Sequence, residues 1–187
     1  MLLAVASPGA VAQGPKLTMH PSGFGERSYA AWRGQEGLPD ARGNADAALY
    51  LQKMTTTTTF AAAVVVFEGV GGLSTAAIMP LGFSFRVEGH CGAGAPRFNV
   101  TFQPAAGGPL ETLFFGCNSN MMSAGTTTDA KGRTWEKRTA TGPLPPGTVL
   151  LLVIVYDEGI EFPPGFVFLD DIRVGSKTWT SPADNGQ

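Results

Sequence analysis

The sequence predicts an all-β domain, a jelly-roll-type sandwich of two antiparallel sheets with one disulfide. Three observations predict it. Residues Arg97–Gln103 alternate polar and apolar side chains, which is the period of a half-buried strand. Short apolar segments recur between clusters of glycine, proline, asparagine and aspartate, without a convincing amphipathic helix. The only two cysteines, Cys91 and Cys117, lie at the outer ends of two neighbouring segments of this kind.

Eight strands are expected after a long irregular N-terminal segment. Residues 13–47 are rich in Gly, Pro, Asp and Asn with little periodicity, which leaves room for one early strand. The expected strands are Ala48–Gln52, Thr59–Phe67, Leu81–Glu88, Arg97–Gln103, Leu110–Gly116, Arg133–Thr139, Thr148–Tyr156 and Phe166–Val174. Eight short strands favour two packed sheets. No repeat or linker divides the chain, so residues 13–187 are expected to form one domain.

The composition excludes some classes of function. Charged residues make up 15% of the chain, well below the roughly 25% usual for globular proteins. The net charge of −2 argues against nucleic acid as a partner, because neutralising phosphates requires a basic face. No apolar run approaches the roughly 20 residues of a membrane-spanning helix, so no membrane span is expected.

The N-terminus and the cysteines indicate export. Ala10–Ala12 fits a signal-peptidase site before Gln13, but the segment is short and lacks a basic region. Residues 1–12 are therefore either a truncated signal peptide or an apolar arm. A Cys91–Cys117 bond would form in an oxidising compartment and would stabilise the fold by roughly 3.5 kcal/mol. A zinc site is not expected, because only His90 adjoins a cysteine.

The segment Val149–Tyr156 is apolar at every position, so both of its faces should be covered. In one interpretation it is a central strand, with one face in the core and the other under a loop or the N-terminal segment. In the other, a second subunit covers the outer face, and the strand is an assembly surface.

The closing segment Phe166–Val174 (FVFLDDIRV) places two adjacent carboxylates among apolar residues. It resembles the last strand of jelly-roll carbohydrate-binding modules attached to xylanases and cellulases. Residues Ser22–Glu26 (SGFGE), with Trp32 following, are similar to the Gly-Phe-Glu motif near the start of those modules, with Gly25 as an addition. The resemblance implies a structural calcium ion held by Glu26 and Asp170. Alternatively, the two aspartates of the closing strand face solvent or cap backbone amides. The cysteine block also resembles that of uncharacterised secreted bacterial proteins.

Sugar binding requires planar aromatic faces with hydrogen-bonding groups beside them. Trp135 shares a predicted strand face with Arg133 and Lys137, so we expect it to lie outside the core. Tyr50 is out of phase with the two leucines beside it, which makes it a second candidate. Further donors and acceptors are expected from the polar face of a neighbouring strand, at Arg97, Asn99 and Thr101. The simpler interpretation of each aromatic residue is an exposed ring or a rim contact.

Catalysis has little support in the sequence. The densest acidic cluster is Asp157, Glu158 and Glu161, whose spacing does not place the carboxylates on one strand face. No nucleophile elbow or phosphate-binding loop occurs, and no catalytic residue is assigned. The leading prediction is a secreted, non-catalytic module that binds a polysaccharide or other glycan and holds a structural calcium ion. The alternative is an extracellular filament or surface-layer subunit that assembles through its N-terminal arm and apolar strand.

Overall fold

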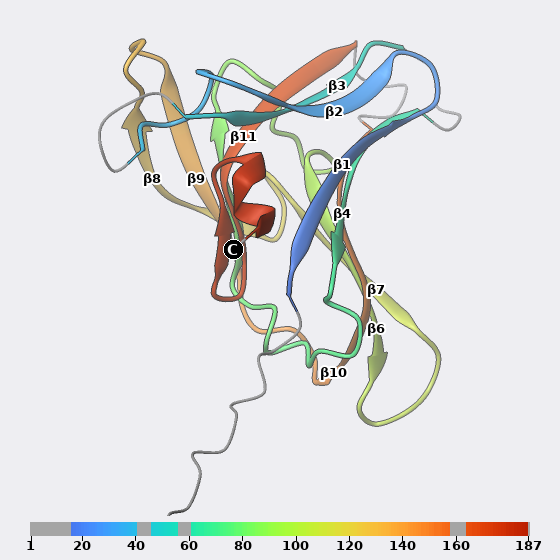
Figure 1. Cartoon of the computed structure of the whole chain (residues 1–187). Helices are drawn as coiled ribbons and strands as arrows, with labels where there is room; N and C mark the ends of the chain where they lie inside the picture. Colours follow the sequence, from blue (N-terminus) through green and yellow to red (C-terminus); the bar gives the residue numbers. More distant parts are fainter. Residues whose placement is uncertain (1–15, 41–45, 56–60, 158–163, 187) are drawn as a thin grey trace, which may run out of the picture.

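The structure, a computed structural model, describes residues 16–40, 46–55, 61–157 and 164–186. Two antiparallel sheets pack as a sandwich (Figure 1), which confirms the predicted fold class. The five-stranded sheet has the order β1 (Thr18–Phe24), β4 (Ala62–Glu68), β10 (Gly147–Tyr156), β6 (Arg97–Pro104), β7 (Glu111–Gly116). The seven-stranded sheet has the order β2 (Ser28–Arg33), β3 (Ala48–Lys53), β11 (Gly165–Val174), β5 (Leu81–Arg86), β9 (Thr134–Ala140), β8 (Met121–Thr128), and β12 (Lys177–Trp179) pairs with β11.

All eight expected strands are present, and β1, β2, β8 and β12 are additional. The sequence leaves room for one early strand within residues 13–47, whereas the structure has two there, β1 and β2. β1 pairs with β4 and β2 pairs with β3. This pairing stabilises both strands, although their own sequences show little periodicity. β8 shows no apolar alternation, because Met121 is its only buried residue. The proposed leader, residues 1–12, lies outside the described residues.

Aromatic side chains join the two sheets in the core. Phe98 of β6 stacks on Phe83 of β5, with ring centroids 5.7 Å apart. Phe67 of β4 contacts Trp179 of β12 at 5.4 Å. β6 turns its phenylalanines and Val100 inward and Arg97 and Asn99 outward, which confirms the predicted alternation.

The disulfide between Cys91 and Cys117 forms as predicted, with 5.3 Å between the Cα atoms. It joins the loop before β6 to the residue after β7, so it fastens the edge of the five-stranded sheet to the preceding loop.

β10 is the central strand of the five-stranded sheet, as one of the two interpretations predicts. Within the single chain, Leu150 and Leu151 are 48% and 45% exposed, so the expected cover by a loop or the N-terminal segment is absent there among the described residues, and cover by a second subunit stays a prediction. A register shift between Val149 and Leu151 explains why two consecutive leucines are exposed, because the extra residue of a bulge turns away from the core.

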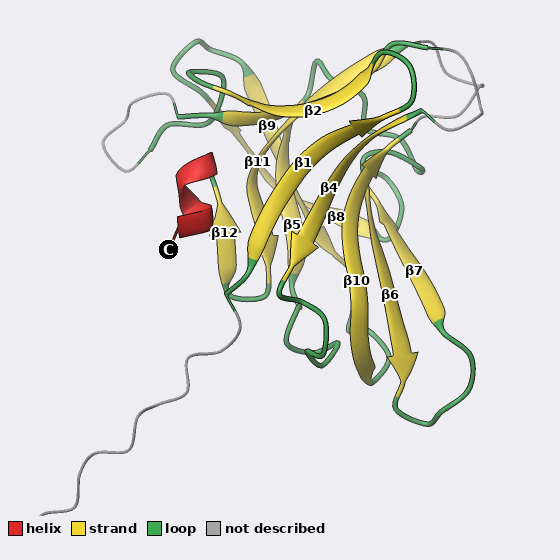
Figure 2. Ribbon diagram, turned by 45° about the vertical axis from the view of Figure 1, so that its right-hand side comes forward, coloured by secondary structure: helices red, strands yellow, loops and turns green. Residues whose placement is uncertain are grey.

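The C-terminus lies against β12 and β1 as a short 3-10 helix, η1 (Pro182–Gly186) (Figure 2). The Asn185 side chain accepts a hydrogen bond from the Met19 amide and donates one to the Met19 carbonyl, at 2.8 and 2.9 Å. Trp179 Nε1 donates to the same side chain at 3.0 Å. These contacts tie the C-terminus to the first strand. Among the described residues, no helix has the length and apolar character needed to cross a membrane.

Candidate functional site

An open groove of about 500 Å³ crosses the outer face of the seven-stranded sheet, over β2, β3 and β11. We call it the aromatic groove, and its lining residues are Tyr29, Arg33, Gly34, Glu36, Tyr50, Phe166 and Phe168. Its volume lies within the usual range for small-molecule sites. Four half-buried rings and two charged side chains therefore surround one concave surface.

Strand alternation places the four rings together. On β3, Leu49 and Leu51 face the core, so Tyr50 between them faces outward, as the sequence predicts. On β11, Phe166 and Phe168 alternate with buried residues in the same way. Register then sets Phe168 directly beside Tyr50, with ring centroids 4.7 Å apart. Tyr50 is the centre of the cluster, since Phe166 and Tyr29 also lie 5.7 Å from it.

Polar groups lie beside these rings. The Tyr50 hydroxyl donates to Gln52 Oε1 at 3.0 Å, and Arg33 donates to the Tyr29 hydroxyl at 2.8 Å. The Arg33 guanidinium lies 5.7 Å from the ring centroids of both tyrosines. Burial raises the pKa of Tyr50, and Tyr29 adds to the rise while Arg33 opposes it. The Tyr50 hydroxyl therefore stays neutral and available for hydrogen bonding.

Glu36 closes one end of the groove within a network of charges. Its carboxylate binds Arg86 at 2.8 Å, Lys131 at 3.0 Å, and Arg133. Burial alone would raise the pKa of Glu36, but hydrogen bonds from these three cations lower it to about 2. Arg86 also lies 3.7 Å from the Phe168 ring centroid, beneath the groove. The network holds the loop after β2 against β5 and β9, so the rim of the groove has a fixed shape.

Trp135 lies on the predicted face but is not available to a ligand. It faces away from the core between the sheets, as expected, yet its exposed fraction is 0%. Its Nε1 donates to Asp129 Oδ2 at 3.0 Å, and Arg133 Nε donates to the same oxygen at 2.6 Å. Burial would raise the pKa of Asp129, but these hydrogen bonds and those from backbone amides lower it to about 2. The expectation of an accessible ring at Trp135 is wrong, because a hydrogen-bonded loop covers it.

Arg97 and Asn99 do not lie beside Trp135 or Tyr50. They project from β6, in the other sheet, so the expectation of a shared surface is wrong. Arg97 makes a two-pronged ion pair with Asp157 at 2.6 and 2.8 Å and donates from Nε to Asn99 at 3.0 Å. These partners already occupy the guanidinium. The acidic residues Glu158 and Glu161 lie outside the described residues.

Glu26 and Asp170 are not brought together either. Glu26 is exposed in the turn between β1 and β2, whereas Asp170 contacts the loop that follows the far end of β2. Asp170 accepts hydrogen bonds from the backbone amides of Leu38 and Asp171, each at 2.7 Å. Within the described ranges, no group of three or more acidic, histidine or cysteine side chains could hold a metal. The predicted pair does not fit a calcium site, and calcium binding stays a prediction.

Asp170 is a buried carboxyl group that makes stability depend on pH. Burial raises its pKa from 3.8 to about 7, against the two amide hydrogen bonds, and Asp171 and Asp46 add to the rise. Between the unfolded pKa near 3.9 and the folded value, the unfolded state binds fewer protons, so stability falls as pH rises. We expect a loss of about 2 kcal/mol from about pH 5 to about pH 7, measured by urea denaturation.

The matched variant is Asp170→Asn, which has nearly the same shape and does not titrate. The variant is expected to be less stable than the natural protein, because the Asn amide nitrogen cannot accept one of the two backbone hydrogen bonds. The free energy of unfolding of the variant should hardly change between about pH 5 and about pH 7. Equal falls in the variant and the natural protein would contradict the assignment.

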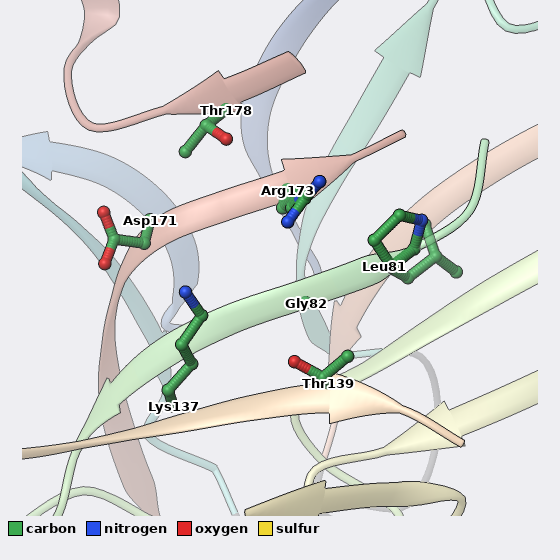
Figure 3. A pocket seen from close by; sticks show the side chains of 8 residues that line it. Leu81, Gly82, Lys137, Thr139, Asp171, Arg173 and Thr178 are labelled. Carbon is green, nitrogen blue, oxygen red and sulfur yellow. The ribbon is translucent and has the colours of Figure 1, made fainter. Parts of the chain in front are cut away.

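A second concave site, of about 190 Å³, lies on the same outer face between β5, β9, β11 and β12. We call it the cationic pocket; Figure 3 shows Lys137 of β9 and Arg173 of β11 on either side of Gly82. Thr139 and Thr178 add hydroxyl groups. Asp171, at the bulge of β11 and with a left-handed φ of 47°, accepts a hydrogen bond from the Ser84 hydroxyl at 3.2 Å. Figure 3 shows its carboxylate beyond the end of the Lys137 side chain.

Sequence reasoning found Tyr50 but missed the rest of the groove. The residues it missed are Tyr29, Arg33, Glu36, Phe166 and Phe168. The two phenylalanines carry a usable signal, because each alternates with a buried residue in a predicted strand. Tyr29 and Arg33 carry no such signal, since they lie in residues 13–47, where the sequence shows little periodicity.

Comparisons of the chain with protein-family models, with curated proteins and with solved structures found no match. What the chain does is therefore inferred from the geometry of the site.

Proposed function

We propose that the chain is an extracellular, non-catalytic carbohydrate-binding module, and that the aromatic groove is its binding site. The observation that carries the proposal is the cluster of four rings around Tyr50, with polar groups at its edge. A pyranose ring has an apolar face and a polar rim, which such a surface complements. The disulfide is in keeping with an oxidising compartment.

Replacing Tyr50 by alanine should weaken glycan binding by at least roughly tenfold, because the central ring of the stacking surface is lost. A glycan array followed by calorimetry on the strongest ligand measures the effect. Phe114→Ala is the matched control: this exposed ring lies on β7, in the other sheet, and its removal should leave affinity unchanged. An unmodified protein that binds no glycan contradicts the function. A Tyr50→Ala variant with full affinity contradicts the site.

Self-assembly is the second candidate function, and the outer face of the five-stranded sheet favours it. Pairing aligns Val66 of β4 with Val153 of β10, and on the far side of Asn99 of β6 it places Phe114 of β7. Leu151 and Phe114 are 45% and 51% exposed, so large apolar side chains face solvent on both sides of the polar outer row of β6. We expect sedimentation velocity to show concentration-dependent oligomers that Leu151→Glu dissociates, if this face joins copies of the chain. A monomer at every concentration contradicts this second function.

A further inference from the structure

Three cations on the outer face of the seven-stranded sheet have no carboxylate partner among the described residues: Arg33, Lys137 and Arg173. Arg33 donates to the Tyr29 hydroxyl, and Arg173 Nε donates to the Gly175 carbonyl at 2.9 Å. These bonds leave most of each guanidinium fork without a partner. Arg33 lines the aromatic groove, and the other two line the cationic pocket.

The groove and the pocket open on one surface. On β11, Phe168 lines the groove and Arg173 lines the pocket, and both project outward. They lie five positions apart in the chain, which corresponds to roughly 15 Å along a strand. A glycan longer than a disaccharide can therefore contact both sites by passing over the loop at Leu38, which covers Asp170 between them.

The region between the two sites does not repel an anion. Three of its carboxylates, Glu36, Glu88 and Asp129, pair with Arg86, Lys131 and Arg133. The fourth, Asp170, is buried under the loop at Leu38, and burial raises its pKa to about 7. Despite burial, hydrogen bonds from the three cations lower the pKa of Glu36 to about 2, and hydrogen bonds from Trp135, Arg133 and Lys131 lower that of Asp129 to about 2. The three unpaired cations outnumber the remaining carboxylate of the pocket, Asp171. The groove and the pocket thus hold more unpaired cations than carboxylates, although the chain has a net charge of −2.

The cationic pocket has the shape and the donors for a carboxylate. Gly82 has no side chain and leaves the floor open between Lys137 and Arg173 (Figure 3). Thr139 and Thr178 supply hydroxyl donors at the walls. An arginine fork matches the two oxygens of a carboxylate, and a lysine ammonium adds a compact charge.

We propose that the ligand is an acidic polysaccharide built from uronate sugars, with one ring on Tyr50 and its carboxylate on Arg33. A carboxylate further along the same chain binds Lys137 and Arg173 in the cationic pocket. This inference rests on the proposed function, because it names the class of glycan that the aromatic groove binds. Charge complementarity selects the occupant: a neutral glycan leaves all three cations without a partner.

The test compares oligogalacturonate with the same oligomer after complete methyl esterification, which converts each carboxylate into a neutral ester. By calorimetry, the natural protein should bind the acidic form at least roughly tenfold more tightly, and added salt should reduce the difference. Arg33→Gln, and Lys137→Gln combined with Arg173→Gln, should each reduce this preference, and the double variant of the cationic pocket should keep its affinity for the ester. Digalacturonate, too short to reach both sites, should respond only to Arg33→Gln. Arg27→Gln, an exposed cation in the β1–β2 turn, is the control and should change nothing.

The outcomes separate this inference from the function on which it rests. Equal binding of acid and ester, or a preference that the variants do not alter, overturns the inference and leaves a neutral-glycan module. Equal binding of poly-aspartate also overturns it, since the cations would then act as a general polyanion surface. Absence of binding to any glycan overturns both.

Discussion

Replacing Trp135 by alanine is expected to lower the free energy of unfolding by about 4 kcal/mol, the cost of removing a fully buried tryptophan. The side chain is 0% exposed, although it lies outside the core between the sheets. It also donates to Asp129, a buried carboxylate that depends on its hydrogen bonds. Urea denaturation of the variant and the natural protein measures the difference.

Trp135→Phe separates packing from the hydrogen bond. It keeps most of the ring and removes the Nε1 donor, so a loss of about 1–2 kcal/mol is expected. Neither variant should abolish glycan binding if it remains folded, because the ring does not reach the groove surface. A stable Trp135→Ala variant that loses binding would show that Trp135 is a ligand contact.

Removing the disulfide is expected to lower the free energy of unfolding by about 3.5 kcal/mol. The bond joins residues 26 positions apart, and its loss lets the unfolded chain explore more conformations. The variant is Cys91→Ala together with Cys117→Ala, measured by urea denaturation beside the natural protein.

The same loss should follow when reductant is added to the natural protein, while the double variant should not respond to reductant. A double variant as stable as the oxidised protein would contradict the stabilising role of the bond. Since the bond lies at an edge of the five-stranded sheet, glycan affinity at the aromatic groove should not change in the folded variant.

The sequence predicts this fold well because period-two alternation is a local property of each strand. Phe98 and Val100 face inward and Tyr50 faces outward for the same reason, and all three follow from neighbours in the chain. β8 could not be found in this way, because an edge strand with one buried residue, Met121, has no alternation to detect. β8 forms because it pairs with β9, and the residues of β8 alone do not predict this pairing.

The candidate site is less predictable because it depends on which strands become neighbours. Arg97 and Trp135 both sit on outward faces, as expected, but their strands belong to different sheets. The burial of Trp135 depends on Asp129, which the β8–β9 turn folds over the ring. Tyr50 gains its aromatic neighbours from β11, more than a hundred residues further along the chain. Alternation along a strand predicts which face of the sheet a residue is on. The order of the strands in the sheet determines which residues become its neighbours.

The most direct test of the central claim is a titration of ¹⁵N-labelled protein with oligogalacturonate, in its charged and methyl-esterified forms. If the outer face of the seven-stranded sheet binds glycan, amide shifts should saturate at Tyr29, Tyr50 and Phe168. Asn99, on the outer face of the other sheet, should not move. Saturable shifts centred on Asn99 instead would contradict the glycan-binding role of the aromatic groove, and no shifts with either form would contradict its specificity for uronate sugars.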